Sequence, residues 1–152
     1  SFDVVWACES MCHTAKKIDF LTECFRILKP GGRLVISDYF LTPDKKDSKG
    51  WVNKWINTWG VPNIIYENSF IKQAKTSGFN KIETFDFTKK ITKSSKRMYR
   101  FSLLGMIPSE LYNLFHPNVS RFAKTHYKCG YYQYKALQNQ LWKYKVVLAI
   151  KN

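Results

Sequence analysis

Two side chains near the start of the chain, Glu9 and His13, have the types and the spacing for proton transfer. An imidazole takes up and releases a proton near neutral pH, so a histidine here suits the work of a general base. Glu9, four residues earlier, could orient the imidazole or accept the proton itself. The alternative is that Glu9 caps the following helix and His13 only forms a hydrogen bond there. The sequence thus offers one candidate acid–base pair and a structural alternative to it.

The elements that must position this pair are a strand, a helix and a second strand. Apolar runs at residues 4–6 and 34–36 predict buried strands, and apolar side chains at three- and four-residue spacing over residues 20–28 predict an amphipathic helix. Parallel strands joined by a helix present their carboxyl ends at one edge of a sheet. Ala7, Cys8 and Glu9 would lie at that edge, together with Ser37, Asp38 and Tyr39.

The ends of this first helix carry their own signals. Asp19 or Thr14 could cap its start. Lys29-Pro30-Gly31-Gly32 is expected to end it, because proline disfavours a helical residue before it and glycine accepts positive φ.

The remainder of the chain alternates helical and extended patterns. A helix is expected over residues 51–59, another from Asn68 or Ser69 to Gly78, and strands over 81–88 and 144–150. Residues 89–135 have a helical pattern that we expect to be interrupted at Pro108 and Pro117.

The composition limits the classes of protein to consider. The 152 residues suffice for one domain, and no apolar run reaches the length of a membrane span. The net charge is +14, but 20 of the 25 basic residues are lysines scattered along the chain. Because specific phosphate and base recognition favours arginine, this points to a solvated surface, or to compensation by a missing acidic part, more than to nucleic acid.

The four cysteines do not have the spacing of a zinc site, and they are interpreted as reduced thiols of a cytoplasmic protein. They are Cys8, Cys12, Cys24 and Cys129.

The order DVVWA, ESMCH, FRILKPGGRLVISD, SGF, IETFDF and KVVLAIK resembles a class I S-adenosylmethionine-dependent methyltransferase. The resemblance covers the second half of that α/β fold, strands four to seven of a Rossmann-like sheet with helical lid insertions. Within the superfamily, residues 9–13 are similar to the E-x-x-x-H segment of sterol and tocopherol C-methyltransferases and of alkaloid N-methyltransferases.

The resemblance implies a domain organisation. Residues 1–152 would be the C-terminal part of one methyltransferase domain, and residues 41–70 and 89–140 would form lid and substrate elements. The family's glycine-rich cofactor turn and the acidic residue after its second strand have no counterpart, since the only adjacent glycines are Gly31 and Gly32. We therefore expect the cofactor-binding N-terminal half of the same protein to be missing from this chain, which would be a fragment, or one half of a two-chain or partly disordered protein, and inactive alone.

The resemblance also implies site residues. The cofactor S-adenosyl-L-methionine would lie against Trp6, Ala7, Cys8 and Glu9, and Glu9 and His13 would serve the methyl acceptor. Substrate contacts are expected from residues of the lid and the second strand: Tyr39, Trp51, Trp55, Trp59 and Tyr131. The tryptophans at spacing four are more readily explained by core packing than by a substrate cage, and no metal is expected.

Three functions follow from these residues. The leading one is methyl transfer to a small hydrophobic or amine-bearing molecule. The second is a non-catalytic methyltransferase-like accessory subunit, because the cofactor turn is absent from this chain. The third, prompted by the charge, is RNA binding or modification. An NPPY-type base-methylation motif is absent, the nearest sequence being Val61-Pro62-Asn63.

Overall fold

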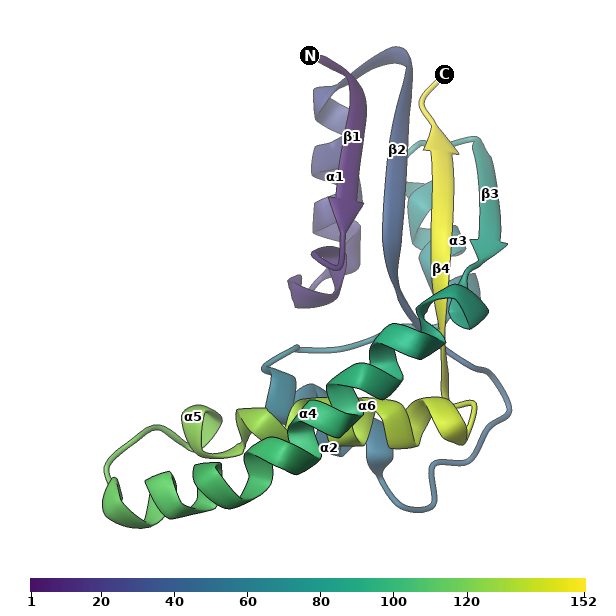
Figure 1. The fold of residues 1–152 in the computed structure, drawn as a ribbon. Helices are drawn as coiled ribbons and strands as arrows, with labels where there is room; N and C mark the ends of the chain where they lie inside the picture. Colours follow the sequence, from purple (N-terminus) through teal and green to yellow (C-terminus); the bar gives the residue numbers. More distant parts are fainter. The chain divides into compact units, whose positions relative to one another are not determined.

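The computed structural model describes all residues 1–152, which form two compact units. Unit 1 comprises Ser1–Pro43, Pro62–Lys89 and Trp142–Asn152, and unit 2 comprises Asp44–Val61 and Lys90–Leu141. Unit 1 holds the sheet and unit 2 holds a group of helices (Figure 1). The assignment of residues 41–70 and 89–140 to a lid stays a prediction.

Unit 1 is built on a four-stranded mixed sheet with the order β1-β2-β4-β3. The strands are β1 (Phe2–Cys8), β2 (Leu28–Leu41), β3 (Lys81–Asp86) and β4 (Trp142–Ile150). β1 and β2 are parallel, with Cys8 opposite Ser37, whereas β4 is antiparallel to both β2 and β3. The predicted α/β fold and the predicted strands are confirmed.

The helices α1 (Lys17–Ile27) and α3 (Glu67–Thr76) cover one face of this sheet (Figure 1). The short helix η1 (Met11–His13) connects β1 to α1. Because strand side chains alternate between faces, β2 directs Leu34, Ile36 and Phe40 toward the helices. The core between sheet and helices contains Leu21, Cys24, Leu28, Leu34, Ile36, Phe40, Phe70, Ala74, Phe79, Val147 and Ala149.

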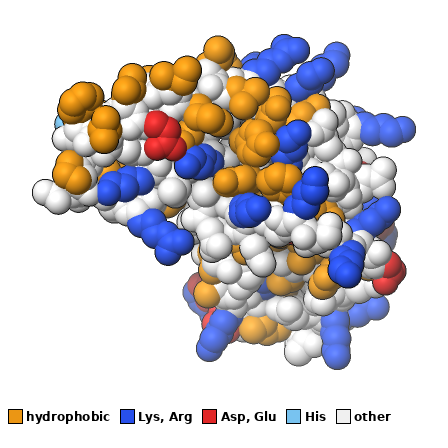
Figure 2. Space-filling model, turned by 90° about the horizontal axis from the view of Figure 1, so that it is seen from below, with side chains coloured by type: hydrophobic (Ala, Val, Ile, Leu, Met, Phe, Trp, Pro, Cys, Tyr) orange, Lys and Arg blue, Asp and Glu red, His pale blue; other side chains and the backbone are white.

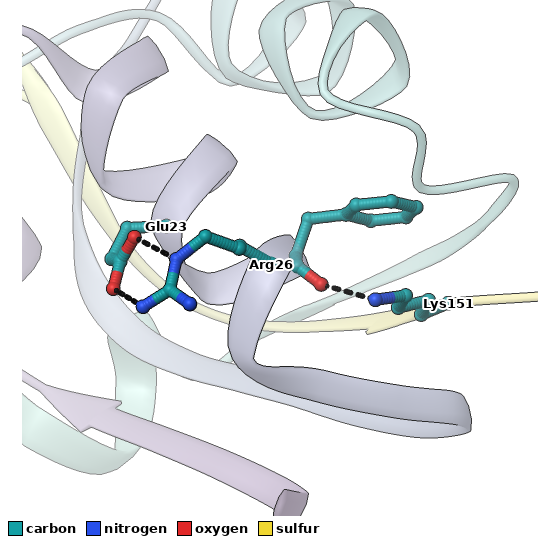
Figure 3. A network of polar contacts seen from close by, with 4 residues as sticks. Glu23, Arg26 and Lys151 are labelled. Carbon is teal, nitrogen blue, oxygen red and sulfur yellow. Dashed lines mark hydrogen bonds and ion pairs between the residues drawn. The ribbon is translucent and has the colours of Figure 1, made fainter. Parts of the chain in front are cut away.

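The ends of α1 differ from the expectation. The helix begins after Lys16, whose side chain makes no capping hydrogen bond, so neither Thr14 nor Asp19 is the cap. It ends at Ile27, and β2 already includes Lys29-Pro30-Gly31-Gly32. The last carbonyls of a helix need donors. Lys151 Nζ donates to the Phe25 oxygen at 2.6 Å (Figure 3). It also donates to the Leu28 oxygen at 2.7 Å.

Gly78, which ends the α3 turn, is required by packing as well as by backbone conformation. Its φ is +105°, and a Cβ at this position would lie 2.6 Å from the Phe25 ring. That ring packs edge-on against Phe79 at 5.2 Å, so Gly78 allows the α3–β3 connection to approach α1.

Unit 2 contains α2 (Trp51–Trp59), most of α4 (Thr88–Phe115), α5 (Arg121–Thr125), η2 (His126–Lys128) and α6 (Cys129–Gln138). α2 packs on α6 through aromatic rings, with Trp51 6.2 Å from Tyr131 and 6.0 Å from Tyr132. α4 approaches α6 so closely that a Cβ on Gly130 would lie 2.8 Å from the Met98 oxygen.

α4 runs through Pro108 without a break, so the interruption predicted there is wrong. A proline inside a helix leaves the carbonyl four residues earlier without its donor. Both Pro108 and Leu104 are exposed, which lets water satisfy that carbonyl. The helix stops at Phe115, before Pro117, as predicted. None of the helices combines the length and apolar character needed to cross a bilayer.

Candidate functional site

The candidate site lies where the carboxyl ends of the parallel strands β1 and β2 meet. Glu9 directly follows β1 with a positive φ of 49°, and its backbone N–H donates to the Ser37 carbonyl at 2.8 Å. In open α/β sheets, ligands bind beyond this edge. The turn therefore places a carboxylate at the position where chemistry is expected.

The Glu9 carboxylate is held by phenol groups of neighbouring strands. The Tyr144 hydroxyl, from β4, donates to Oε1 at 3.1 Å, and Tyr39, from β2, also forms a side-chain hydrogen bond with Glu9. Burial, followed by the charge of Glu9, raises the pKa of both Tyr39 and Tyr144 above the ordinary tyrosine range. Both hydroxyls thus keep their protons and act as donors. The capping role considered for this carboxylate is replaced by a network across three strands.

His13 is exposed at the end of η1, while the two residues before it are buried. A buried carboxylate fixes this short helix: Asp38 accepts from the Cys12 N–H at 3.0 Å and from its own neighbour, the Tyr39 N–H, at 2.8 Å. Burial raises the pKa of Asp38. Asp38 therefore helps to fix the position of His13 through its hydrogen bond with the N–H of the preceding residue, Cys12.

A buried ammonium group binds the opposite side of the same segment. Lys17 Nζ donates to the Cys12 carbonyl at 3.0 Å and to the Asn63 carbonyl at 3.2 Å. Burial lowers the pKa of Lys17. The peptide groups of Cys12 are thus held by Asp38 on the N–H side and by Lys17 on the carbonyl side. Asp38 carried a signal in the sequence, its place at a strand end, but Lys17 carried none, because its burial depends on the fold.

The four residues expected to meet the cofactor point in different directions. Ala7 is buried toward the helices, whereas Trp6 on the opposite face is 73 % exposed. Cys8 is exposed, with Sγ 3.9 Å from the Tyr144 hydroxyl. Only Trp6, Cys8 and Glu9 therefore offer side chains at the open face and end of β1. An indole, a thiol and a carboxylate fit one side of a ligand that carries apolar and cationic groups.

The residues expected to contact substrate divide between the units. Tyr39, in unit 1, is buried, with its ring edge-on to Trp142 at 5.1 Å and to Tyr144 at 5.2 Å. Trp51, Trp55, Trp59 and Tyr131 belong to unit 2. The Trp55 ring is fully buried and stacks on Trp59 at 5.6 Å, which is the core-packing interpretation of this stripe. Their contact with a substrate stays a prediction.

Unit 2 has two hollows of its own. The larger, of about 620 Å³, contains three cationic side chains and no acidic one. Its lining is Lys54, Asn57, Thr58, Gly60, Arg121, Phe122, Thr125, Lys128 and Tyr132. The smaller, of about 340 Å³, is lined in part by Trp59, Phe101 and His126. The sequence did not predict this cationic lining, because α2 and α5 are more than sixty residues apart along the chain.

Comparison with known proteins gives three kinds of match. Residues 1–36 match the family described as "Methyltransferase domain". Squalene methyltransferase 1 of Botryococcus braunii is 32 % identical over 90 residues, which cover 57 % of this chain and 24 % of that protein. The 2-methyl-6-phytyl-1,4-hydroquinone methyltransferase of Synechocystis is 30 % identical over 95 residues, which cover 58 % of this chain and 30 % of that protein.

The solved structures that match establish the fold. A putative sarcosine dimethylglycine methyltransferase from Galdieria sulphuraria superposes with a TM-score of 0.73 and 17 % identity, over all of this chain and 54 % of that one. Phosphoethanolamine N-methyltransferase 2 of Haemonchus contortus gives 0.72 and 18 %, over 99 % of this chain and 34 % of that one. The chain thus spans about a quarter to a third of the curated relatives named here and about a third to a half of these structures.

Proposed function

We propose that this chain is part of a class I S-adenosylmethionine-dependent methyltransferase similar to the squalene and 2-methyl-6-phytyl-1,4-hydroquinone enzymes, and that the intact protein methylates a small apolar molecule. The observation that carries the proposal is the Glu9 carboxylate, held by Tyr144 at 3.1 Å and followed four residues later by the exposed His13. S-adenosylmethionine supplies a methyl group on a positively charged sulfur. The residues of this chain position the acceptor and move its proton.

Glu9 has the orienting role in this proposal. Because its two tyrosine partners keep their protons, the carboxylate is fixed at the end of β1 and directs negative charge toward the open face. This charge favours a cationic group there, whether it belongs to the cofactor or develops on the acceptor. His13, exposed and fixed through the Cys12 peptide groups, is placed to remove a proton from the acceptor.

The names of the relatives support an apolar acceptor over an amine-bearing one. They include enzymes named for squalene and for 2-methyl-6-phytyl-1,4-hydroquinone. An amine-bearing acceptor is the second candidate, because structural neighbours are named for phosphoethanolamine and for sarcosine dimethylglycine.

We propose further that the free edge of β1 pairs with another strand of the same protein. β1 has β2 as its one partner in the sheet, and Phe2, Val4 and Trp6 are exposed along its open face. An unpaired apolar edge of this kind invites another strand. The cofactor would then lie between that part of the protein and the end of β1.

The test uses the intact protein and begins with calorimetric titration of S-adenosylmethionine. Methyl transfer is then measured with an isoprenoid hydroquinone, a small amine and RNA. We expect cofactor binding and product from the isoprenoid. Cofactor binding without any product would favour the accessory subunit, and product from RNA at physiological salt would favour the third function.

His13→Ala tests the acid–base assignment. Turnover should fall by about 10²–10⁴-fold, since a positioned general base contributes on that order, while the dissociation constant for S-adenosylmethionine stays within a few-fold. His116→Ala, at an exposed histidine of unit 2, is the matched control and should leave turnover unchanged. Turnover of His13→Ala close to that of the control would show that His13 is not the base.

A further inference from the structure

Helix α4 buries polar side chains and exposes apolar ones, which is the opposite of a helix that covers a hydrophobic core. Its buried positions are small and polar, Ser95 and Ser102, and Ser95 Oγ lies 3.1 Å from Oε1 of Gln133 in α6. Ser102 meets α6 at Gly130, where an added Cβ would lie 2.7 Å from the serine oxygen. The side of α4 that packs against α6 therefore consists of these two small buried serines and the Tyr99 ring, which stacks on Tyr131 at 5.5 Å.

The large apolar side chains of α4 lie on its outer face. Five of them are 64–75 % exposed, and their successive spacings of three, three, seven and one residues place them on one side of the helix. They are Phe101, Leu104, Ile107, Leu114 and Phe115, and we call this group the α4 apolar face. Figure 2 shows hydrophobic side chains gathered on the surface, with Lys and Arg side chains beside them. Large exposed apolar side chains grouped on one face of a helix are typical of an interaction site.

The turns of α4 that precede this face are strongly basic. They expose six cationic side chains, Lys89, Lys90, Lys93, Lys96, Arg97 and Arg100. The single acidic residue of α4, Glu110, is already paired with Lys128 at 3.0 Å and bonded to Tyr127. Cationic turns thus lead directly into the α4 apolar face, with no free carboxylate to offset them.

We propose that the α4 apolar face docks on the surface of an anionic lipid bilayer. Lysine and arginine attract anionic headgroups, and phenylalanine, leucine and isoleucine enter the boundary with the acyl chains. A second copy fits less well, because it carries the same net charge of +14. RNA would satisfy the cations but not the apolar side chains. No helix here can span a bilayer, so the contact is made from the surface.

The test is flotation of the intact protein with vesicles of phosphatidylcholine alone and of phosphatidylcholine mixed with phosphatidylglycerol. We expect binding to the mixed vesicles at least about tenfold tighter, since each cation near such a surface contributes measurably. The readout needs neither cofactor nor acceptor, so it is independent of the proposed methyl transfer.

Two paired variants separate the apolar and the cationic contributions. Leu104→Gln with Ile107→Gln should weaken binding to the mixed vesicles about tenfold or more, because two exposed aliphatic groups no longer enter the lipid. Phe85→Gln, at an exposed aromatic residue of β3, is the control and should change nothing. Lys93→Gln with Lys96→Gln should remove most of the preference for phosphatidylglycerol, whereas Lys72→Gln with Lys75→Gln on α3 should not.

Three outcomes would overturn the proposal: no binding to either kind of vesicle, equal effects of the α4 variants and their controls, or a concentration-dependent dimer that the Leu104 and Ile107 changes abolish. The last outcome would assign the α4 apolar face to a second copy.

Discussion

Large apolar side chains are buried in helices α1 and α3 of unit 1 but exposed in helix α4, most of which lies in unit 2. In unit 1, Leu21 and Phe70 point into the core and are fully buried. In α4, Phe101 and Leu104 point outward, and Ser95 and Ser102 are the buried residues. Hydrophobic pattern and burial therefore agree in unit 1 and disagree in α4. Exposed apolar side chains grouped on one helix are typical of an interaction surface.

The burial of particular charged side chains also differs between the two units. Unit 1 buries Asp38 and Lys17 around one peptide segment, at a cost in desolvation that their hydrogen bonds offset. In unit 2, Lys54, Arg121 and Lys128 line an open hollow. Unit 1 uses buried charge to fix the segment that carries His13, and unit 2 presents charge to solvent.

The largest expected effect is on the core of unit 1. Phe70→Ala removes a fully buried ring that packs edge-on against Phe40 at 5.5 Å. The free energy of unfolding should fall by about 3–5 kcal/mol, as for other buried aromatic side chains. Chemical denaturation of the intact protein measures it. A loss below about 1 kcal/mol would mean that the core of unit 1 is no more tightly packed than α4.

The next effect concerns the buried carboxylate. Asp38→Ala leaves the Cys12 and Tyr39 N–H groups without their acceptor, which should cost about 2–3 kcal/mol. Asp47→Ala is the matched change in unit 2, where Asp47 accepts from the Trp51 N–H at 2.8 Å and the Val52 N–H at 2.9 Å near the surface. Its cost should be about 1 kcal/mol, as for a helix cap. Equal costs would remove the distinction between the two carboxylates.

The pH dependence of Asp38 has a defined sign. Because burial raises its pKa in the folded protein, the native state holds a proton that the unfolded chain releases above the ordinary value of 3.8. The stability that Asp38 contributes is therefore fully present at low pH and decreases as pH rises from 3.8 through its native pKa. The difference in unfolding free energy between the wild type and Asp38→Ala, followed against pH, checks this sign.

A smaller effect, on turnover, is expected at the candidate site around Glu9. Tyr144→Phe removes the donor 3.1 Å from Glu9 but keeps the ring packed against Tyr39. Turnover should fall about tenfold, in line with the loss of one charge-assisted hydrogen bond, and stability should change little. Tyr66→Phe, at an exposed tyrosine of unit 1, is the control. Loss of cofactor binding rather than turnover would place Glu9 in cofactor recognition.

The smallest effect on stability belongs to α4. Leu104→Ala should change the unfolding free energy by less than about 0.5 kcal/mol, because a side chain that is 74 % exposed has little packing to lose. The same type of residue in the sheet core, Leu34, is fully buried, and Leu34→Ala should cost about 2–5 kcal/mol. A large loss at Leu104 would show that this face is covered in the intact protein.

The sequence predicted the elements of unit 1 well because local rules and burial agree there. The structure contains the elements expected there: strands at residues 4–6 and 34–36, a helix over most of residues 20–28, and the strands that end at Asp86 and Ile150. The errors fall at helix ends and at Pro108. The end of α1 is fixed by Lys151, a residue more than one hundred positions away, and the helix at Pro108 continues because its outer side faces solvent.

By itself, the sequence determined the fold class, the position of Glu9 and His13 after a parallel strand, and the resemblance to class I methyltransferases. Those features depend on side-chain type and on spacing within a few residues. The tertiary structure alone decided which groups act together: Tyr144 and Tyr39 on Glu9, Asp38 and Lys17 on the Cys12 segment, and serines rather than leucines on the buried side of α4. The physical reason is that burial and hydrogen-bond partners are set by segments that meet only after folding, and no local pattern encodes them.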